Sequence, residues 1–324
     1  MEKPGQLTGV FLRWEDDPWL WGTLMTLLTS FSNHPTQMKT LRFGYTLALC
    51  FFLLGILPES VKSQSVEQGL AALDQGQYES ALRIFDMHAH AGGPMAQSRL
   101  GYMYHRVLGV STDREQAQSW YQKAAEQEEP RALNNLGVLL DWEDPEDCRK
   151  AYKHLREAAE QGFPSAKTNL GIFLEQGSCF EQPAYGLALI FYRDAAKAGE
   201  MTAQHRIGSM YYRGKGVPAD TVTTSTWWRL AAKQGHIPSQ RYLSYLLAQG
   251  EGVKADAWES YMWMHAAMLD NKAIRTSEEW KEHYHALTKQ LSTREREAAH
   301  REARALRNRW LHSSDRHAPR ARGR

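Results

Sequence analysis

The sequence has little of several features that mark common protein classes. It has three cysteines in 324 residues, too few for a disulfide-rich scaffold. Its 39 basic and 37 acidic residues give a formal net charge of +2, so no global field selects a nucleic acid. It lacks a nucleophile-elbow pattern, a Walker loop and a dinucleotide-binding glycine fingerprint. We therefore expect no enzyme, no catalytic residues and no cofactor.

The sequence also lacks a metal-ligand pattern, although it has 13 histidines. The histidine pairs 88/90 and 283/285 are two residues apart, which points their side chains to different faces of a helix. The acidic run 141–147 offers oxygen ligands, but Pro145 and the missing glycine pivot argue against an EF-type calcium loop. We expect no metal site.

What the sequence has instead is a repeat of 34 to 37 residues. Its first marker is a small residue on an amphipathic first helix, found at Gly101, Gly137, Gly171, Gly208 and Ser244. Its second marker is an alanine pair on a second helix, found at Ala124 and Ala125, Ala158 and Ala159, Ala195 and Ala196, Ala231 and Ala232, and Ala266 and Ala267. A helical repeat with a period in the mid-thirties predicts stacked helix pairs.

The segment 201–235 shows the repeat most fully. Ile207 and Gly208 lie on the apolar face of its first helix, and Gly214 ends that helix because glycine tolerates a positive φ. Small residues such as Gly208 let helix axes approach near the lower end of the usual range of about 8–10 Å. The large side chain of Trp228 then fills the space between layers.

The pattern Ala-x4-Gly-x2-Tyr, Gly-x-Gly-Val, aromatic-x2-Ala-Ala-x2-Gly resembles the Sel-one-like repeat (SLR), a relative of the tetratricopeptide repeat. The resemblance covers roughly residues 66–310. It implies an all-α fold, a right-handed α-α superhelical solenoid of antiparallel helix pairs. It also implies a monomer that binds a protein or peptide partner.

In the tetratricopeptide fold, the first helices line a concave groove. The resemblance assigns to the groove the residues three before, one after and four after the small residue. The residue five after the small residue is assigned to the rim of the groove. For each residue, packing between helices is the competing interpretation. The groove and rim residues are Tyr102, His105, Arg106, Asn134, Asp141, Trp142, Thr168, Glu175, His205, Tyr212, Arg213, Arg241 and Tyr245.

The segments outside the repeats have their own patterns. Residues 38–63 combine a basic start with the apolar run 45–57, which predicts a signal peptide beginning at Met38. An uncleaved anchor is the alternative. Residues 1–37 then form a non-native or disordered upstream extension. The signal predicts an exported, periplasmic protein whose membrane contact is limited to this segment.

Residues 64–272 are expected to hold about six repeats, and residues 273–312 two capping helices. Each capping helix has a capping-box pattern, Thr276 with Glu279 and Ser292 with Glu295. Residues 313–324 are expected to form a basic, disordered tail.

Cys148 and Cys179 are the cysteines that follow the predicted signal peptide. Loops of successive repeats stack along one edge, so the two residues can be neighbours that pair in an oxidising compartment. Pairing requires Cα atoms within about 7 Å. The alternative is two unrelated small residues.

We therefore expect a non-enzymatic scaffold or adaptor that binds proteins or peptides in a bacterial envelope. The alternative is a cell-wall-acting protein that binds or hydrolyses peptidoglycan. Relatives of that kind carry a cysteine pair in each repeat, which this chain lacks.

Overall fold

A computed structural model describes residues 65–314, apart from residues 107, 110–112, 178, 181, 270, 272, 273 and 275, with side chains to residue 310. The chain divides into two units, Met1–Gln64 and Ser65–Arg324, and the described residues all belong to the second. The upstream extension, the signal segment and residues 315–324 of the basic tail lie outside the described residues, so the interpretations of them remain predictions. In the part of the chain that the structure describes, no helix is both long and apolar enough to cross a membrane.

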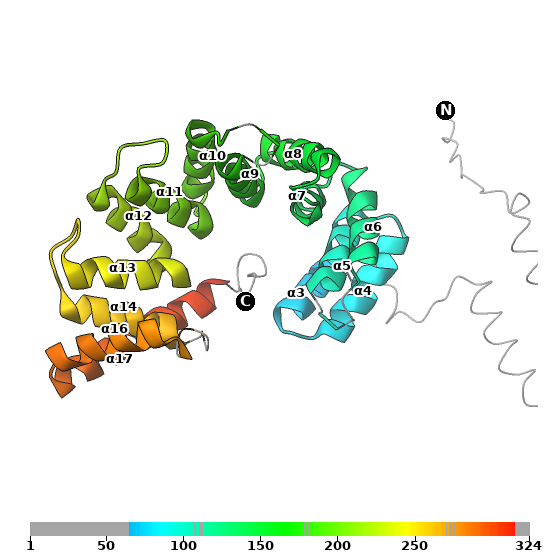
Figure 1. Ribbon diagram of the computed structural model, residues 1–324. Helices are drawn as coiled ribbons and strands as arrows, with labels where there is room; N and C mark the ends of the chain where they lie inside the picture. Colours follow the sequence, from blue (N-terminus) through cyan, green and yellow to red (C-terminus); the bar gives the residue numbers. More distant parts are fainter. Residues whose placement is uncertain are drawn as a thin grey trace, which may run out of the picture. The chain divides into compact units, whose positions relative to one another are not determined.

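All regular elements of the described residues are α-helices, which confirms the all-α repeat fold. The first helix of each pair and its partner are α3 (Val66–Asp74) and α4 (Tyr78–His90), α5 (Pro94–Arg106) and α6 (Arg114–Ala125), α7 (Pro130–Leu139) and α8 (Pro145–Glu160), α9 (Pro164–Gln176) and α10 (Tyr185–Lys197), α11 (Met201–Arg213) and α12 (Thr221–Lys233), and α13 (Ile237–Gln249) and α14 (Ala257–Leu269). Each pair packs on the next (Figure 1).

In α5, α7, α9 and α11 the small residue lies directly against a large side chain of the partner helix. A Cβ atom added to Gly208 would be 2.5 Å from Cδ1 of Trp228. The equivalent contacts join Gly101 to Tyr121, Gly137 to Leu155, and Gly171 to Tyr192. This confirms the close approach that the repeat predicts, because no side chain larger than hydrogen fits at these four positions without a shift of its neighbour.

The helix ends follow local chemistry. Gly214 ends α11 with a φ of 66°, and its N–H bonds to the carbonyl oxygen of Met210. Asp220 begins α12 by accepting hydrogen bonds from the main-chain N–H groups of Val222 and Thr223, at 2.9 and 3.1 Å. These are the C-terminal glycine and N-terminal aspartate that stabilise helix ends.

Two further helices, α16 (Glu278–Gln290) and α17 (Thr293–Ser314), cover the last repeat and both contact α14. The capping box of Ser292 and Glu295 forms: the Ser292 N–H donates to the Glu295 carboxylate at 2.8 Å, and the Glu295 N–H donates to Ser292 Oγ at 3.3 Å.

The other predicted capping box, of Thr276 and Glu279, is wrong. Ser277 is the residue that precedes α16, and its side chain makes no capping hydrogen bond. The third helical position is therefore Trp280, which is buried in the core. Burial of this tryptophan sets where the helix begins.

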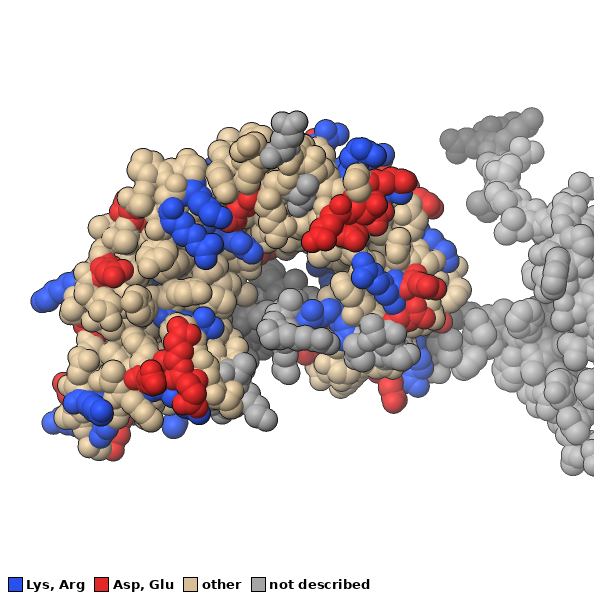
Figure 2. Space-filling model, in the orientation of Figure 1, with Lys and Arg blue, Asp and Glu red and all other residues tan. Residues whose placement is uncertain are grey.

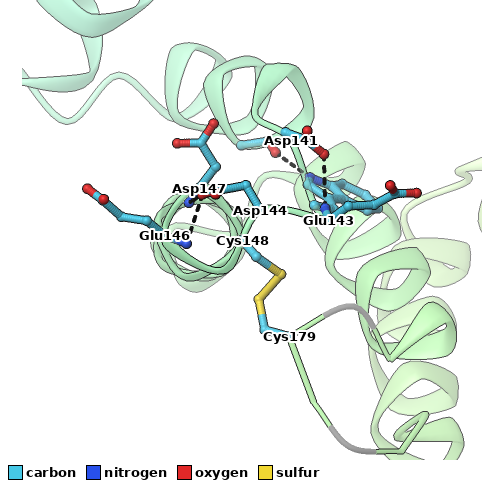
Figure 3. The surroundings of a disulfide bond; sticks show 9 residues. Asp141, Glu143, Asp144, Glu146, Asp147, Cys148 and Cys179 are labelled. Carbon is cyan, nitrogen blue, oxygen red and sulfur yellow. Dashed lines mark hydrogen bonds between the residues drawn. A yellow bond between two sulfur atoms is a disulfide. The ribbon is translucent and has the colours of Figure 1, made fainter.

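Cys148 of α8 and Cys179, in the loop after α9, form a disulfide with Cα atoms 5.8 Å apart (Figure 3). The adjacent acidic segment forms turns. One carboxylate oxygen of Asp144 accepts hydrogen bonds from the N–H groups of Glu146 and Asp147, each at 2.9 Å. The disulfide therefore links two successive repeats beside a loop that lacks the usual glycine turn.

Candidate partner-binding surface

The first helices form a continuous face, which we call the first-helix surface. The helices α5, α7, α9, α11 and α13 lie on the same side of the row of helix pairs (Figure 1). In addition to its own partner, α7 contacts both α5 and α9. Side chains on neighbouring first helices can therefore act on one ligand together.

One end of this surface holds an open cavity of about 400 Å³. It is lined by His105, Arg114, Val138, Leu139, Leu140, Asp141 and Trp142. The structure thus brings three of the predicted groove residues to one place: His105, Asp141 and Trp142. Val138 adds an exposed apolar side chain.

Asp141 and Trp142 reach the cavity from a loop, since α7 ends at Leu139. The groove assignment, which counts positions along a helix, therefore falls at these two residues on the segment that replaces the glycine loop. The loop is held because the Trp142 indole donates a 2.9 Å hydrogen bond to the carbonyl oxygen of Gly137. The Trp142 ring also meets Phe173 edge-on at 5.0 Å.

Two ionisable side chains line the cavity. Burial lowers the pKa of His105, and the charges of Arg106 and Arg114 lower it further. Asp141 accepts a hydrogen bond from the Glu143 N–H at 2.9 Å. Among the described residues, no hydrogen bond joins His105 to Asp141.

Two predicted groove residues are buried between helices. Asn134 is 6% exposed and Thr168 is 3% exposed. The Asn134 side chain accepts a hydrogen bond from Asn169 at 2.7 Å and donates one to Asn135 at 3.0 Å. The expectation that Asn134 and Thr168 line an open groove is wrong, because adjacent first helices pack closely at this position.

A column of polar and aromatic residues lies one residue further along each helix. It consists of the residues two before the small residue, of which Arg99 is buried, Asn135, Asn169 and Arg206 are half-buried and Tyr242 is exposed. The recurrence of Arg and Asn at that spacing was present in the sequence and could have identified it. The column begins inside the protein, since Arg99 is only 6% exposed and burial lowers its pKa to about 10.

Glu175 is largely committed to contacts within the repeat. It is 10% exposed, accepts a hydrogen bond from the Tyr192 hydroxyl at 2.8 Å, and lies 3.6 Å from Arg206 and 3.9 Å from Lys215. Its negative charge therefore offsets nearby cations and is poorly placed to meet a partner.

The opposite end of the first-helix surface is aromatic. Tyr212 and Tyr245 are each 41% exposed, and Tyr242 is 38% exposed. The buried ring of Trp228 lies between Tyr212 and Tyr242, with ring centroids 5.4 and 5.3 Å away. Tyr242 also meets Trp280 of α16 edge-on at 6.5 Å. A row of rings thus crosses the four helices α11, α12, α13 and α16.

His205 lies beside these rings and stays neutral. Its Nδ1 is 2.9 Å from Ser239 Oγ, which is also 3.0 Å from Nδ1 of His236. Burial lowers the pKa of His205 to about 3 and that of His236 to about 4. The positive charges of Arg206, Arg213 and Arg241 add to the effect on His205. The surroundings of His205 are therefore strongly positive.

Arg241, Tyr102, Arg106 and Arg213 complete the predicted set. Arg241 is half-buried and its guanidinium lies 4.2 Å above the Trp280 ring. Tyr102 is half-buried, whereas Arg106 and Arg213 are exposed. The predicted residues thus divide into a cavity on α5 and α7 and an aromatic, basic area on α11 and α13.

Among the described residues, no group of three or more histidines, cysteines or carboxylates is placed to hold a metal ion. The arrangement offers flat aromatic rings, guanidinium groups and an open cavity. Such a surface can bind a partner through packing and hydrogen bonds.

Comparison with known proteins gives the same picture. A Sel1 repeat protein from Oxalobacter formigenes is 27% identical, with a TM-score of 0.59, over 74% of this chain and 99% of that one. The c5321 protein, a protective antigen of uropathogenic Escherichia coli with an SLR fold, is 25% identical with a TM-score of 0.59, over 75% of this chain. The match spans 53% of the c5321 chain.

A shorter match is to the chitin synthase regulator SKT5 of Saccharomyces cerevisiae, which is 37% identical over 91 residues. It covers 28% of this chain and 11% of the yeast protein. The Sel1 repeat pattern itself matches five consecutive segments, residues 94–129, 130–163, 164–200, 202–236 and 237–268. The chain belongs to the Sel1 repeat family.

Proposed function

We propose that this protein is a non-enzymatic scaffold that binds a protein or peptide partner on its first-helix surface. The observation that carries the proposal is the set of exposed tyrosines on α11 and α13, namely Tyr212, Tyr242 and Tyr245, with Arg241 against the Tyr242 ring. Tyr, Trp and Arg are the side chains that most often anchor protein interfaces. Repeat solenoids use extended faces of this kind for binding.

A second apolar area exists on the partner helices, where Ile190 of α10 is 56% exposed and Leu230 of α12 is 44% exposed. These side chains are aliphatic. They serve as the control for the first-helix surface, because they are at least as exposed as Val138 and Tyr245 and lie on second helices of the solenoid.

The test is co-purification of a partner with substituted chains. We expect Val138→Glu and Tyr245→Ala to weaken recovery of the partner at least about tenfold, since each alters the first-helix surface. Ile190→Glu and Leu230→Glu should leave recovery unchanged. The reverse pattern would place the partner on the second helices and contradict the proposal.

Location is a further part of the proposal: the protein is exported and acts in the periplasm of a bacterium. The signal-like segment 38–63 supports this. The disulfide between Cys148 and Cys179 is consistent with it, because disulfides persist mainly in oxidising compartments. Fractionation of cells that express a chain starting at Met38 tests the location. A protein found only in the cytoplasm with both thiols free contradicts it.

A further inference from the structure

We propose that the aromatic end of the first-helix surface is a subsite for an acidic segment of the partner, in which an Asp or Glu carboxylate binds Arg241. We call this the Arg241 subsite, formed by Tyr212, Tyr242, Tyr245, Arg241 and Trp280. The proposal rests on the proposed function and specifies the chemistry of the partner.

Arg241 is held ready by its neighbours. Its guanidinium carbon lies 4.2 Å from the centroid of the Trp280 ring and 5.4 Å from that of Tyr242. The two rings are nearly perpendicular to each other, and contact with both limits the rotamers of the Arg241 side chain. Less conformational entropy is then lost when a carboxylate forms two parallel hydrogen bonds with it.

The charge of Arg241 has no counterpart in the described part of the protein. No carboxylate there lies in ion-pair range of its guanidinium, and its Nε atom is buried without a hydrogen-bond partner. Because the Nε atom is closed to a ligand from outside, a carboxylate would meet the terminal nitrogens of the guanidinium, which have no hydrogen-bond or ion-pair partner among the described residues. Arg241 is therefore a cation without a paired carboxylate.

The surroundings add positive potential. Arg206, Arg213 and Arg241 all act on His205, whose pKa they help to lower. Glu175 is already paired with Arg206 and Lys215. Figure 2 shows basic side chains gathered over α11 and α12, and acidic ones beside α7 and α8 and around α16. Glu279 of α16 acts on His283, which contacts Trp280 and Tyr245, so the positive potential is centred on the arginines of α11 and α13. An anion is favoured at those arginines.

His205 and His236 lie near the subsite but are neutral and engaged in hydrogen bonds with Ser239. The Nδ1 atom of His236 accepts from the Ser239 N–H at 3.3 Å, so the Ser239 hydroxyl can donate to His236 while it accepts from His205. This hydrogen-bond chain uses the facing nitrogens of both rings. The histidines therefore hold α11 against α13 and leave Arg241 as the group that receives the carboxylate.

The three tyrosines define what accompanies the carboxylate. Tyr242 and Tyr245 are three positions apart on α13 and share a face. Their exposed rings offer packing area for an apolar or aromatic side chain next to the acidic one. A peptide with a Glu-Phe-Glu core has both features.

The experiment measures fluorescence anisotropy of three labelled peptides with the full chain. Their cores are Glu-Phe-Glu, Gln-Phe-Gln and Lys-Phe-Lys, with the same flanking Gly and Ser residues. We expect the glutamate peptide to bind about tenfold or more tightly than its glutamine isostere, because charge-assisted hydrogen bonds are replaced by neutral ones. The lysine peptide should bind most weakly.

Substitutions assign this preference to the subsite. Arg241→Gln should reduce the glutamate preference to less than about twofold, and Arg241→Lys should retain only part of it, because lysine cannot form the two parallel bonds. Arg149→Gln, at an exposed position of α8, is the matched control and should change nothing. A second variant, Arg213→Gln, removes another positive charge near the subsite. Because Arg213 is exposed, we expect this change to weaken binding of the glutamate peptide without disturbing the aromatic rings.

Three outcomes overturn the proposal: equal binding of the glutamate and glutamine peptides, no binding of any peptide, or an unchanged glutamate preference in Arg241→Gln. Preferential binding of a glucuronate oligosaccharide or of anionic lipid vesicles over the glutamate peptide would also overturn it. If the peptides bind equally but Tyr245→Ala weakens all of them, the proposed function stands and only the acidic specificity fails.

Discussion

The indole N–H of Trp310 donates a 2.6 Å hydrogen bond to the main-chain carbonyl oxygen of Lys233, 77 positions earlier in the chain. The ring lies against Gly235, where an added Cβ would be 3.0 Å from it. This contact connects α17 to the end of α12, two helices before the one that α17 mainly covers. The last helix is therefore part of the repeat core.

Replacing Trp310 tests this role. We expect Trp310→Ala to lower the free energy of unfolding by about 3–5 kcal/mol, because it removes a large buried ring. Trp310→Phe keeps most of the ring and should cost less, about 1 kcal/mol for the hydrogen bond and the lost ring area. Urea denaturation measures both, and equal stability of the alanine variant and the native chain would contradict the account of α17.

A methyl group at Gly208 should also destabilise the fold. The new Cβ would lie 2.5 Å from the Trp228 ring, so we expect Gly208→Ala to cost about 1–3 kcal/mol through overpacking. Gly186→Ala in α10 is the matched control, because an added Cβ there meets nothing within 4 Å. It should be neutral or stabilise by up to about 1 kcal/mol. Thermal melts measure both variants. A Gly208→Ala chain as stable as the Gly186→Ala chain would argue against close packing at the small residue.

Loss of the disulfide should weaken the middle of the solenoid. Cys148 and Cys179 are 31 positions apart, and closing a loop of that size stabilises a fold by roughly 2–4 kcal/mol. The double variant Cys148→Ser with Cys179→Ser should therefore melt at a lower temperature than the oxidised chain. A reducing agent should lower the melting temperature of the native chain and leave the double variant unaffected. Identical melts with and without reductant would show that the bond contributes nothing.

Acid should destabilise the protein in a defined range of pH. The His265 ring stacks on His300 with centroids 3.9 Å apart, and its Nδ1 lies 3.2 Å from the Tyr284 hydroxyl. Burial, the charge of His300 and then Arg304 lower the pKa of His265 to about 4. His205 and His236 have pKa values of about 3 and about 4 for similar reasons.

A histidine in the unfolded chain has a pKa of about 6.5, so the unfolded state binds more protons between pH 6.5 and about pH 4. The stability contributed by the neutral rings is complete above pH 7 and is lost as pH falls through that range, by roughly 1–2 kcal/mol for each histidine at pH 5. Denaturant titrations at several pH values measure this slope. His265→Gln should flatten it, and a flat native profile from pH 7 to pH 5 would contradict the neutral-histidine account.

The sequence was sufficient to predict the fold, because the repeat is a local pattern. Gly208 and the alanine pair recur at fixed spacing, and each has a packing reason that applies to every copy. Irregular positions were harder. Asp141 had the spacing of a helical residue, yet α7 ends at Leu139 and the following turn carries it.

The candidate surface was predicted less well, for a geometric reason. Positions two and three before the small residue differ by about 100° around the helix. Asn134 is therefore buried while Asn135 is half-buried, and the resemblance alone selected the more buried of the two in this repeat. Contacts between distant segments, such as Arg241 on Trp280, depend on how α16 packs and have no local signal.

The central claim is that partners bind the first-helix surface, and site-specific photo-crosslinking tests it most directly. A photoreactive phenylalanine analogue replaces Tyr212 or Tyr242 in one set of chains, and Ile190 or Leu230 in a second set of matched exposure. After irradiation with the co-purified partner, mass spectrometry identifies the crosslinked peptides. The account predicts partner crosslinks from positions 212 and 242 and none from 190 and 230. Crosslinks from positions 190 and 230 alone would contradict it.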